Sequence, residues 1–239
     1  MGVGRATVDH FGDSVMAAPL PGDTWRTKHD TIKTSIHGLL LWSGLRADCG
    51  VYGLFSHLIP AQDPTRGEGL EWGRKRQALL PDFRLELPNP LGTTDSTLAE
   101  LKTIGAVCSR YPRGNRNKAV ERRAGLLQGE YVRKVARVDQ QVLGTPRGEV
   151  GPLQRKLESF GDILGLVVGA FGEGSADLHD LVHTMARSRL RVQGLAEGRE
   201  GSETVLGVIT GQVRHTLSTA TIRAQSLCLL ACLDKMGEG

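Results

Sequence analysis

Two apolar segments of this chain carry charged residues at regular positions: Leu79-Leu80-Pro81-Asp82-Phe83-Arg84-Leu85 and Leu98-Ala99-Glu100-Leu101-Lys102-Thr103-Ile104. Side chains alternate between the two faces of a strand, so Glu100 and Lys102 are expected on one face and Leu101 on the other. An Asp82 on the neighbouring strand would bring two carboxylates together beside one lysine. Because Mg²⁺ takes one or two carboxylates from a protein and keeps waters and substrate phosphates, the pattern suits phosphodiester hydrolysis.

The interval between the two acids fits a β-hairpin. Asp82 and Glu100 are 18 positions apart, and Pro88-Asn89-Pro90-Leu91-Gly92 lies between them. This interval leaves room for the end of one strand, a turn rich in Pro, Asn and Gly, and the start of the next strand.

Pro81-Asp82 followed by Glu100-Leu101-Lys102 resembles the signature of the PD-(D/E)XK nuclease superfamily. The resemblance implies an α/β, restriction-endonuclease-like αβββαβ core, with a central mixed sheet flanked by helices. It further implies that Asp82, Glu100 and the backbone carbonyl of Leu101 hold Mg²⁺ or Mn²⁺. Lys102 would then orient the attacking water or neutralise developing charge, in an enzyme that cleaves DNA.

The order of elements expected from periodicity matches that core independently. The expected elements are a helix over 25–45, strands over 51–59, 79–87 and 97–104, a helix over 118–141, a strand over 163–171, and helices over 176–191 and 203–234. Residues 1–24 have no periodicity and are expected to form a flexible arm. Residues 25–239 are expected to form a single domain whose C-terminal part, about 175–235, is helical.

Positive charge is concentrated in one segment. The whole chain has a net charge of +4, whereas residues 110–137 hold nine basic and two acidic residues. Such a field favours a polyanion, because each neutralised phosphate releases condensed counterions. DNA is the expected partner, with RNA left open. The residues expected to contact it are Arg110, Arg113, Arg116, Lys118, Arg122, Arg123, Tyr131 and Lys134.

Three further residues are candidates for accessory roles that the resemblance implies. The family often adds a residue from the helix before the first strand, where His29 and Asp30 lie. Asp30 is equally explained by an interaction with the helix dipole. Recombination-type members carry a Gln-x-x-x-Tyr element, and this chain has Gln128-Gly129-Glu130-Tyr131, which is one residue shorter.

Composition indicates an intracellular protein, nuclear or cytoplasmic, that does not span a membrane. The longest apolar run, residues 163–171, is far shorter than the roughly 20 residues of a membrane span. The first twenty residues lack the pattern of a secretory signal. The four cysteines show no paired CxxC spacing and are expected to be reduced.

Other interpretations of the acidic motif remain. Asp82 could cap a turn after Pro81, while Glu100 and Lys102 form a solvated pair worth less than about 1 kcal/mol. The chain could also be a nuclease-like copy that has lost its activity. It could be a non-catalytic nucleic-acid-binding or assembly module of a larger mobile-element protein. The segments 98–104, 111–114 and 119–124 look like nuclease-type domains encoded in mobile elements.

A zinc hydrolase is the remaining alternative. His179 and His183 have the i, i+4 spacing of a helical zinc pair, with Asp180 where zinc proteases place a glutamate. No obvious third ligand follows in the sequence. Histidines at this spacing on an amphipathic helix are commonly surface residues.

Overall fold

The computed structural model of the chain describes residues 24–50, 54–55, 57–58, 79, 81–89, 93–105, 115–195, 197–199 and 201–237. The elements in this part of the chain are α2 (Thr24–Trp42), β1 (Arg46–Cys49), β2 (Phe83–Pro88), β3 (Thr94–Thr103), α4 (Asn117–Val142), α5 (Pro152–Glu158), β4 (Leu164–Val168), α6 (Ala176–Val192) and α7 (Ser202–Gly237). The expected order of a helix, three strands, a helix, a strand and two helices is present, with α5 as an additional helix.

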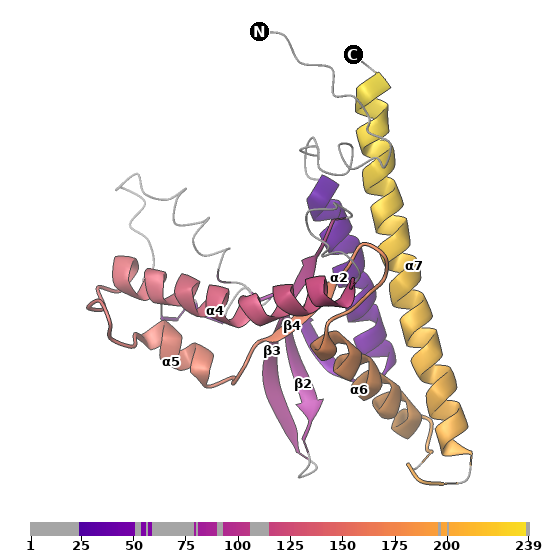
Figure 1. The fold of residues 1–239 in the computed structure, drawn as a ribbon. Coiled ribbons are helices and arrows are strands. Elements are labelled where there is room, and N and C mark those ends of the chain that lie inside the picture. Colours follow the sequence, from indigo (N-terminus) through magenta and orange to yellow (C-terminus); the bar gives the residue numbers. More distant parts are fainter. Residues whose placement is uncertain are drawn as a thin grey trace. The chain divides into compact units, whose positions relative to one another are not determined.

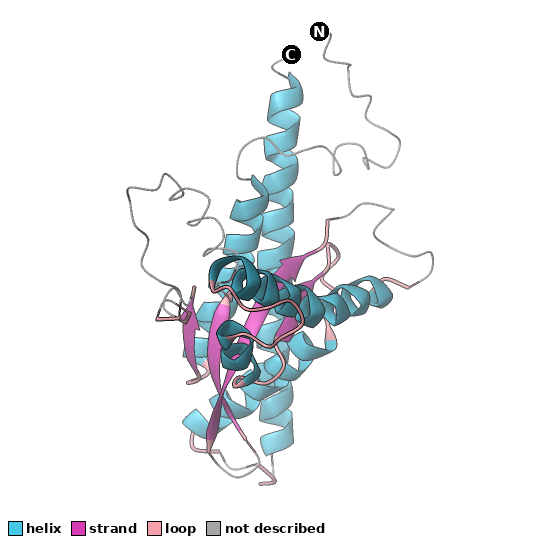
Figure 2. Ribbon diagram, turned by 90° about the vertical axis from the view of Figure 1, so that its left-hand side faces the viewer, coloured by secondary structure: helices cyan, strands magenta, loops and turns pink. Residues whose placement is uncertain are grey.

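The four strands form one mixed sheet in the order β1-β2-β3-β4, drawn in magenta in Figure 2. The pairings of β1 with β2 and of β2 with β3 are antiparallel. The predicted α/β class, with a mixed sheet flanked by helices, is therefore confirmed.

The first strand lies earlier in the sequence than its apolar pattern predicts. β1 covers Arg46–Cys49, whereas the described residues of the predicted strand 51–59 lie in turns. Gly50, with φ +62°, ends the strand. Leu54 and Phe55 lie in the turn that follows, and their side chains are buried, so these apolar residues contribute to the core without forming a strand. The prediction of a strand over 51–59 is wrong for these residues.

The chain divides into two compact units. The first comprises Met1–Gly44, Leu101–Arg123 and Leu166–Gly239, and the second comprises Leu45–Glu100 and Ala124–Gly165. The elements β3, β4 and α4 each contribute residues to both units. The single domain expected over residues 25–239 stays a prediction.

In the first unit, α7 runs alongside α2 and also packs against α6 (Figures 1 and 2). The apolar residues Ile32, Ile36 and Leu40 recur every four positions of α2 and are fully buried, as a core-facing helix requires. On α7, Ile209 and Val213 are buried at the same spacing. Three helices thus share one apolar interior in this unit.

The end of α2 is fixed by a glycine and a cation. Gly44 has φ +81°, the left-handed conformation common just after a helix, and a Cβ there would lie 2.7 Å from Cγ2 of Val192. Arg189 of α6 donates to the carbonyl of Trp42 at 3.1 Å, and its guanidinium carbon lies 4.6 Å from the centroid of the indole ring. A cation at a helix C-terminus also interacts favourably with the helix dipole.

The core of the second unit is built between α4, α5 and the strands. Tyr131, Val135 and Val138 follow the i, i+4, i+7 spacing of one helix face and are buried. They pack against buried residues of the other elements, which are Leu54, Phe55, Leu79, Leu98, Leu153, Leu157 and Ile163.

Asp139 of α4 positions α5, which runs beside α4 in Figure 1. Its side chain is fully buried, and its two oxygens accept the N–H groups of Leu153 and Gln154, each at 3.0 Å. These N–H groups belong to the first turn of α5, where no intrahelical acceptor exists. Gly151 allows the close approach, because a Cβ at this position would overlap the side chain of Asp139.

Asn89 closes the hairpin between β2 and β3. Its N–H donates to the carbonyl of Thr93 at 2.9 Å, and its Oδ1 accepts the N–H of Thr93 at 3.0 Å. Its Nδ2 donates to Oγ1 of Thr93 at 2.6 Å and to Oδ1 of Asp95 at 3.1 Å. Three of these four contacts are made by the Asn89 side chain.

Candidate active site

The two predicted carboxylates adjoin the end of the β2–β3 pairing. The register ends at Phe83 opposite Ala99, and Asp82 and Glu100 are the next residues along the two segments. The charges of both raise the pKa of Tyr131, so both lie near this side chain. Both residues belong to the second unit. The structure thus brings Asp82 and Glu100 together.

A buried tyrosine lies beside this pair. Asp82 is 9% exposed, Glu100 is 7% exposed and Tyr131 is 2% exposed. The Tyr131 hydroxyl donates a hydrogen bond to the carbonyl of Leu79. Burial raises the pKa of Tyr131 above its usual range, and the negative charges of Glu100 and Asp82 raise it further. The two acids therefore create a negative field within a poorly solvated part of the unit.

The donor set suits a hard cation. Asp82 and Glu100 offer carboxylate oxygens, which favour Mg²⁺ or Mn²⁺ over softer metals. Across the residues that the structure describes, no group of three or more His, Cys, Asp or Glu side chains could hold a metal ion. A cation that completes its coordination with water and substrate oxygens fits two protein carboxylates.

The remaining motif residues follow Glu100 on β3. Leu101 is fully buried, and Lys102 is half-buried. Lys102 follows Glu100 by two positions, so the two side chains leave the strand on the same face. The boundary between the two units falls after Glu100, and Leu101 and Lys102 belong to the first unit.

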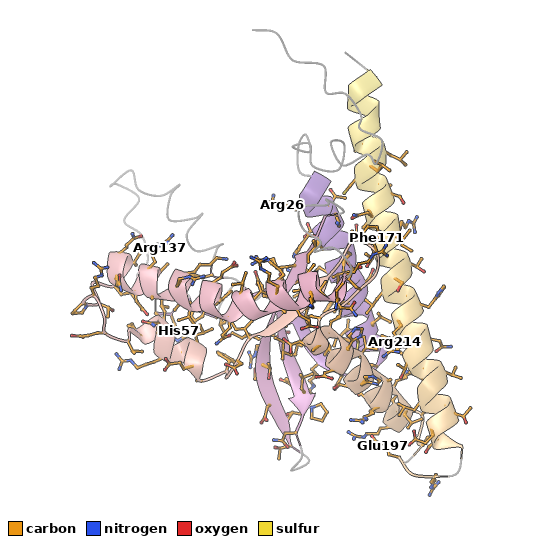
Figure 3. The ribbon with its side chains drawn as sticks, viewed as in Figure 1. Arg26, His57, Arg137, Phe171, Glu197 and Arg214 are labelled. Atoms are coloured by element: carbon orange, nitrogen blue, oxygen red, sulfur yellow. The ribbon has the colours of Figure 1, made fainter. Side chains whose placement is uncertain are left out.

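The basic residues have different environments. Arg110 and Arg113 lie outside the described residues. Arg116 lies over the ring of Phe171, with 4.3 Å between the guanidinium carbon and the ring centroid, and Phe171 is labelled in Figure 3. Lys118 and Arg122 are exposed on α4. Two further basic residues, Arg123 and Lys134, are partly buried, and Tyr131, the remaining residue expected to contact DNA, is buried.

Tyr131 corrects one expectation. Its sequence position predicts a helix face shared with Lys134 that meets a phosphate backbone. The structure instead buries Tyr131 in the core of the second unit, and its hydroxyl is engaged with Leu79. Lys134 has its Nζ 5.9 Å from the centroid of the Tyr131 ring. Tyr131 is therefore a packing residue next to the two acids and is not available to a phosphate.

The three accessory candidates have structural partners. Nδ1 of His29 lies 3.1 Å from Oδ1 of Asp30. Asp30 is outside the first turn of α2, which contains no acidic residue, so an interaction with the helix dipole does not explain it. Oε1 of Gln128 accepts the N–H of Ile163 at 2.9 Å and so connects α4 to the residue before β4.

The histidine pair on α6 is exposed and faces a cation. His179 and His183 are both exposed. Nε2 of His183 lies 3.4 Å from a guanidinium nitrogen of Arg214 on α7, which is labelled in Figure 3. No third ligand accompanies this pair among the described residues. The zinc interpretation gains no support from these contacts.

Arg84 is a candidate that sequence reasoning missed. It lies on β2 two positions after Asp82, which immediately precedes the strand. Its Nε donates to Oγ of Ser96 at 2.9 Å, which fixes the guanidinium across the hairpin. The position of a cation two residues after Asp82 is the signal in the sequence that could have identified Arg84.

Comparisons of the chain with models of known protein families, with curated proteins and with solved structures return no match.

None of the helices in the described part of the chain combines the length and the apolar character needed to cross a membrane.

Proposed function

We propose that the chain is a metal-dependent nuclease that hydrolyses phosphodiester bonds of DNA, with a restriction-endonuclease-like αβββαβ core. The observation that carries the proposal is the proximity of two nearly fully buried carboxylates, Asp82 and Glu100, at the end of the β2–β3 pairing. Mg²⁺ takes one or two carboxylates from a protein and completes its coordination with water and substrate oxygens. The sequence supports the same chemistry, since Lys102 follows Glu100 in the acid-x-lysine pattern.

The proposed roles follow from the chemistry of the reaction. Hydrolysis forms a bond between a water oxygen and phosphorus and breaks the bond from phosphorus to a deoxyribose oxygen, while the water loses a proton and the leaving oxygen gains one. A bound Mg²⁺ or Mn²⁺ supplies charge relief at the phosphate and a more acidic water. Asp82 and Glu100 hold that ion, and the resemblance adds the carbonyl of Leu101. The Lys102 ammonium orients the attacking water or stabilises the negative charge that develops.

Exposed cations on α4 support a polyanionic substrate. Lys118 and Arg122 are both exposed, near the start of the segment with the concentrated positive charge. Such residues contribute affinity that is independent of sequence and falls with salt concentration. DNA binding therefore forms part of the proposal, and Lys118 and Arg122 are its best-described contacts.

Cleavage assays test the proposal. Supercoiled plasmid and linear single- and double-stranded DNA are incubated with Mg²⁺, Mn²⁺ or EDTA and the wild-type chain, Asp82→Ala or Lys102→Ala. We expect metal-dependent cleavage by the wild type alone. Equal cleavage by all three proteins would place the activity elsewhere. Binding that persists in EDTA, without cleavage in either metal by a folded wild type, would show a non-catalytic module.

A further inference from the structure

A groove of about 940 Å³ opens in the second unit, between the β2–β3 hairpin and the segment from α5 to β4. We call it the hairpin groove and define it by Arg84 and Ser96 on one side and by Lys156 and Phe160 on the other. His57, labelled in Figure 3, also lines it. All of these residues lie within the second unit.

The hairpin groove begins beside the carboxylate pair. Arg84 is the second residue of β2, and Asp82 lies two positions before it, just outside the strand, so the two residues are at most about 7 Å apart along the chain. The bond from Nε of Arg84 to Oγ of Ser96 holds the guanidinium at the wall of the groove. A strand whose phosphate reaches Asp82 and Glu100 would therefore have its neighbouring phosphate near Arg84.

The charges in the groove favour an anion in its interior. Arg84 and Lys156 are half-buried, whereas the two acids of the lining, Asp95 and Asp162, are exposed. Asp95 accepts a hydrogen bond from Asn89 at the end of the hairpin. None of the described carboxylates forms an ion pair with Arg84 or Lys156. The two cations are therefore available to phosphate oxygens.

Phe160 adds an aromatic surface. Its ring is half-buried, and Nζ of Lys156 lies 5.0 Å from its centroid. An aromatic ring combined with cations is the arrangement that binds unpaired nucleic acid, because bases stack on the ring while cations contact phosphates. The volume lies within the range of about 300–1,000 Å³ that is typical for small-ligand sites, so the groove suits a few nucleotides.

We infer that the hairpin groove binds a short unpaired segment of a DNA strand next to the carboxylate pair. Arg84 and Lys156 contact its phosphates, and a base stacks on Phe160. The inference rests on the proposed nuclease function and names its substrate class: DNA with a single-stranded end or flap beside the cleaved bond.

Binding without metal tests the groove separately from catalysis. Fluorescence polarisation in EDTA compares a 12-nucleotide single strand with a duplex of the same length. The variants are Lys156→Ala and Phe160→Leu, with Arg155→Ala as the matched control. Arg155 is an exposed neighbour on α5 that does not line the groove. Phe160→Leu keeps apolar packing, and thermal unfolding checks that each variant folds.

We expect the wild type to prefer the single strand. Phe160→Leu is expected to weaken its binding about tenfold, as loss of one stacked base would. Lys156→Ala is expected to remove about one phosphate contact. The slope of the logarithm of the binding constant against the logarithm of salt concentration should then become less steep by roughly 0.7. Arg155→Ala should change affinity less than twofold. Equal effects of Lys156→Ala and Arg155→Ala, with none from Phe160→Leu, would overturn the inference. Tighter binding of an RNA of the same sequence would overturn its assignment to DNA.

Cleavage of a flap substrate and of a blunt duplex separates the two proposals. If the wild type binds DNA through the hairpin groove but does not cleave it, the proposed nuclease function is wrong and the groove is still supported as a binding site. If cleavage depends on metal but shows no preference for the flap, and Phe160→Leu cleaves at the wild-type rate, the nuclease function is supported. The inference that the hairpin groove binds an unpaired strand is then overturned.

Discussion

Asp82 and Glu100 adjoin the last pair of the β2–β3 register, Phe83 and Ala99, and both side chains are nearly fully buried. Two carboxylates close together at a buried position suit a divalent cation that keeps water and substrate oxygens as its other ligands.

A divalent cation should stabilise the protein without DNA. A ligand that binds only the folded state adds RT ln(1 + [L]/Kd), which is about 1.4 kcal/mol at ten times Kd. We expect Mg²⁺ to raise the melting temperature of the wild type and to have no effect on Asp82→Asn/Glu100→Gln. Thermal unfolding at constant ionic strength, with Na⁺ as the compensating cation, measures this. An equal increase for both proteins would show that Mg²⁺ acts elsewhere.

Glu100→Gln should abolish cleavage while preserving the fold. The substitution keeps the shape of the side chain and removes its charge, so we expect the rate to fall about a hundredfold or more. Glu86→Gln is the matched control. Glu86 is partly exposed on β2, with its Oε2 3.7 Å from a guanidinium nitrogen of Arg46. Plasmid cleavage rates in Mg²⁺ compare the two variants, and a similar loss in both would argue against a special role for Glu100.

Tyr131 should make the protein lose stability at alkaline pH. The pKa of Tyr131 is raised above its ordinary value of 10.0 in the folded state, so the unfolded chain releases the proton first as pH increases. Stability is then fully present below about pH 10 and falls above it by about 1.4 kcal/mol per pH unit. Tyr131→Phe should remove this slope and cost about 1 kcal/mol at neutral pH through the lost bond to Leu79. Denaturant unfolding between pH 8 and 11 tests both, and an unchanged alkaline slope in the variant would contradict the prediction.

Gly151→Ala should be destabilising, and part of the cost should depend on Asp139. The added Cβ overlaps the Asp139 side chain, so we expect a loss of about 1–3 kcal/mol. Asp139→Ala alone should cost about 1–2 kcal/mol, because two N–H groups of α5 lose their acceptors. A double-mutant cycle by denaturant unfolding should give a combined loss smaller than the sum by about 1 kcal/mol. Additive losses would show that the two positions do not contact each other.

Lys28→Met should stabilise the protein at neutral pH. Lys28 is 8% exposed on α2, and its Nζ donates to the carbonyl of Ile104 at 3.4 Å. Burial lowers its pKa, and the charge of Cys228 opposes this shift. The folded state then binds fewer protons than the unfolded state below pH 10.5, so wild-type stability increases with pH towards that value.

Melting temperatures between pH 7 and 9.5 test this prediction. The gain from Lys28→Met should be largest at pH 7 and should decrease as pH rises. Arg26→Met is the control, because Arg26 is an exposed cation on the same helix and is labelled in Figure 3. A loss of stability in Lys28→Met would show that the bond to Ile104 outweighs the burial of the charge.

The long helices were predictable because their patterns are local. The predicted 118–141 corresponds to α4 at Asn117–Val142, and the predicted 176–191 corresponds to α6 at Ala176–Val192. Each carries apolar residues at helical spacing over several turns. α5 was not predicted, because it has only seven residues and its first turn is capped by Asp139, which is 14 positions before Leu153. A contact between residues that far apart in the sequence produces no periodic pattern of apolar residues.

The candidate site was predictable only in part. The proximity of Asp82 and Glu100 follows from the hairpin, which the sequence indicates. The burial of Tyr131 does not, because its hydroxyl partner is the carbonyl of Leu79, 52 positions earlier. Tyr131 follows Glu130 and lies three positions before Lys134, a pattern that favours an exposed helix face, and tertiary packing decides otherwise.

Asn89 closes the hairpin separately from the strand residues that carry the two acids. Residues added or lost in that turn would leave Asp82 near Glu100, whereas one residue inserted between Leu98 and Glu100 would turn Glu100 to the opposite face. During evolution, the interval of 18 positions is therefore free to drift, while the spacing of Glu100 and Lys102 is constrained. A search for distant relatives should allow a variable gap between the acids and require the acid-x-lysine pattern on a buried strand.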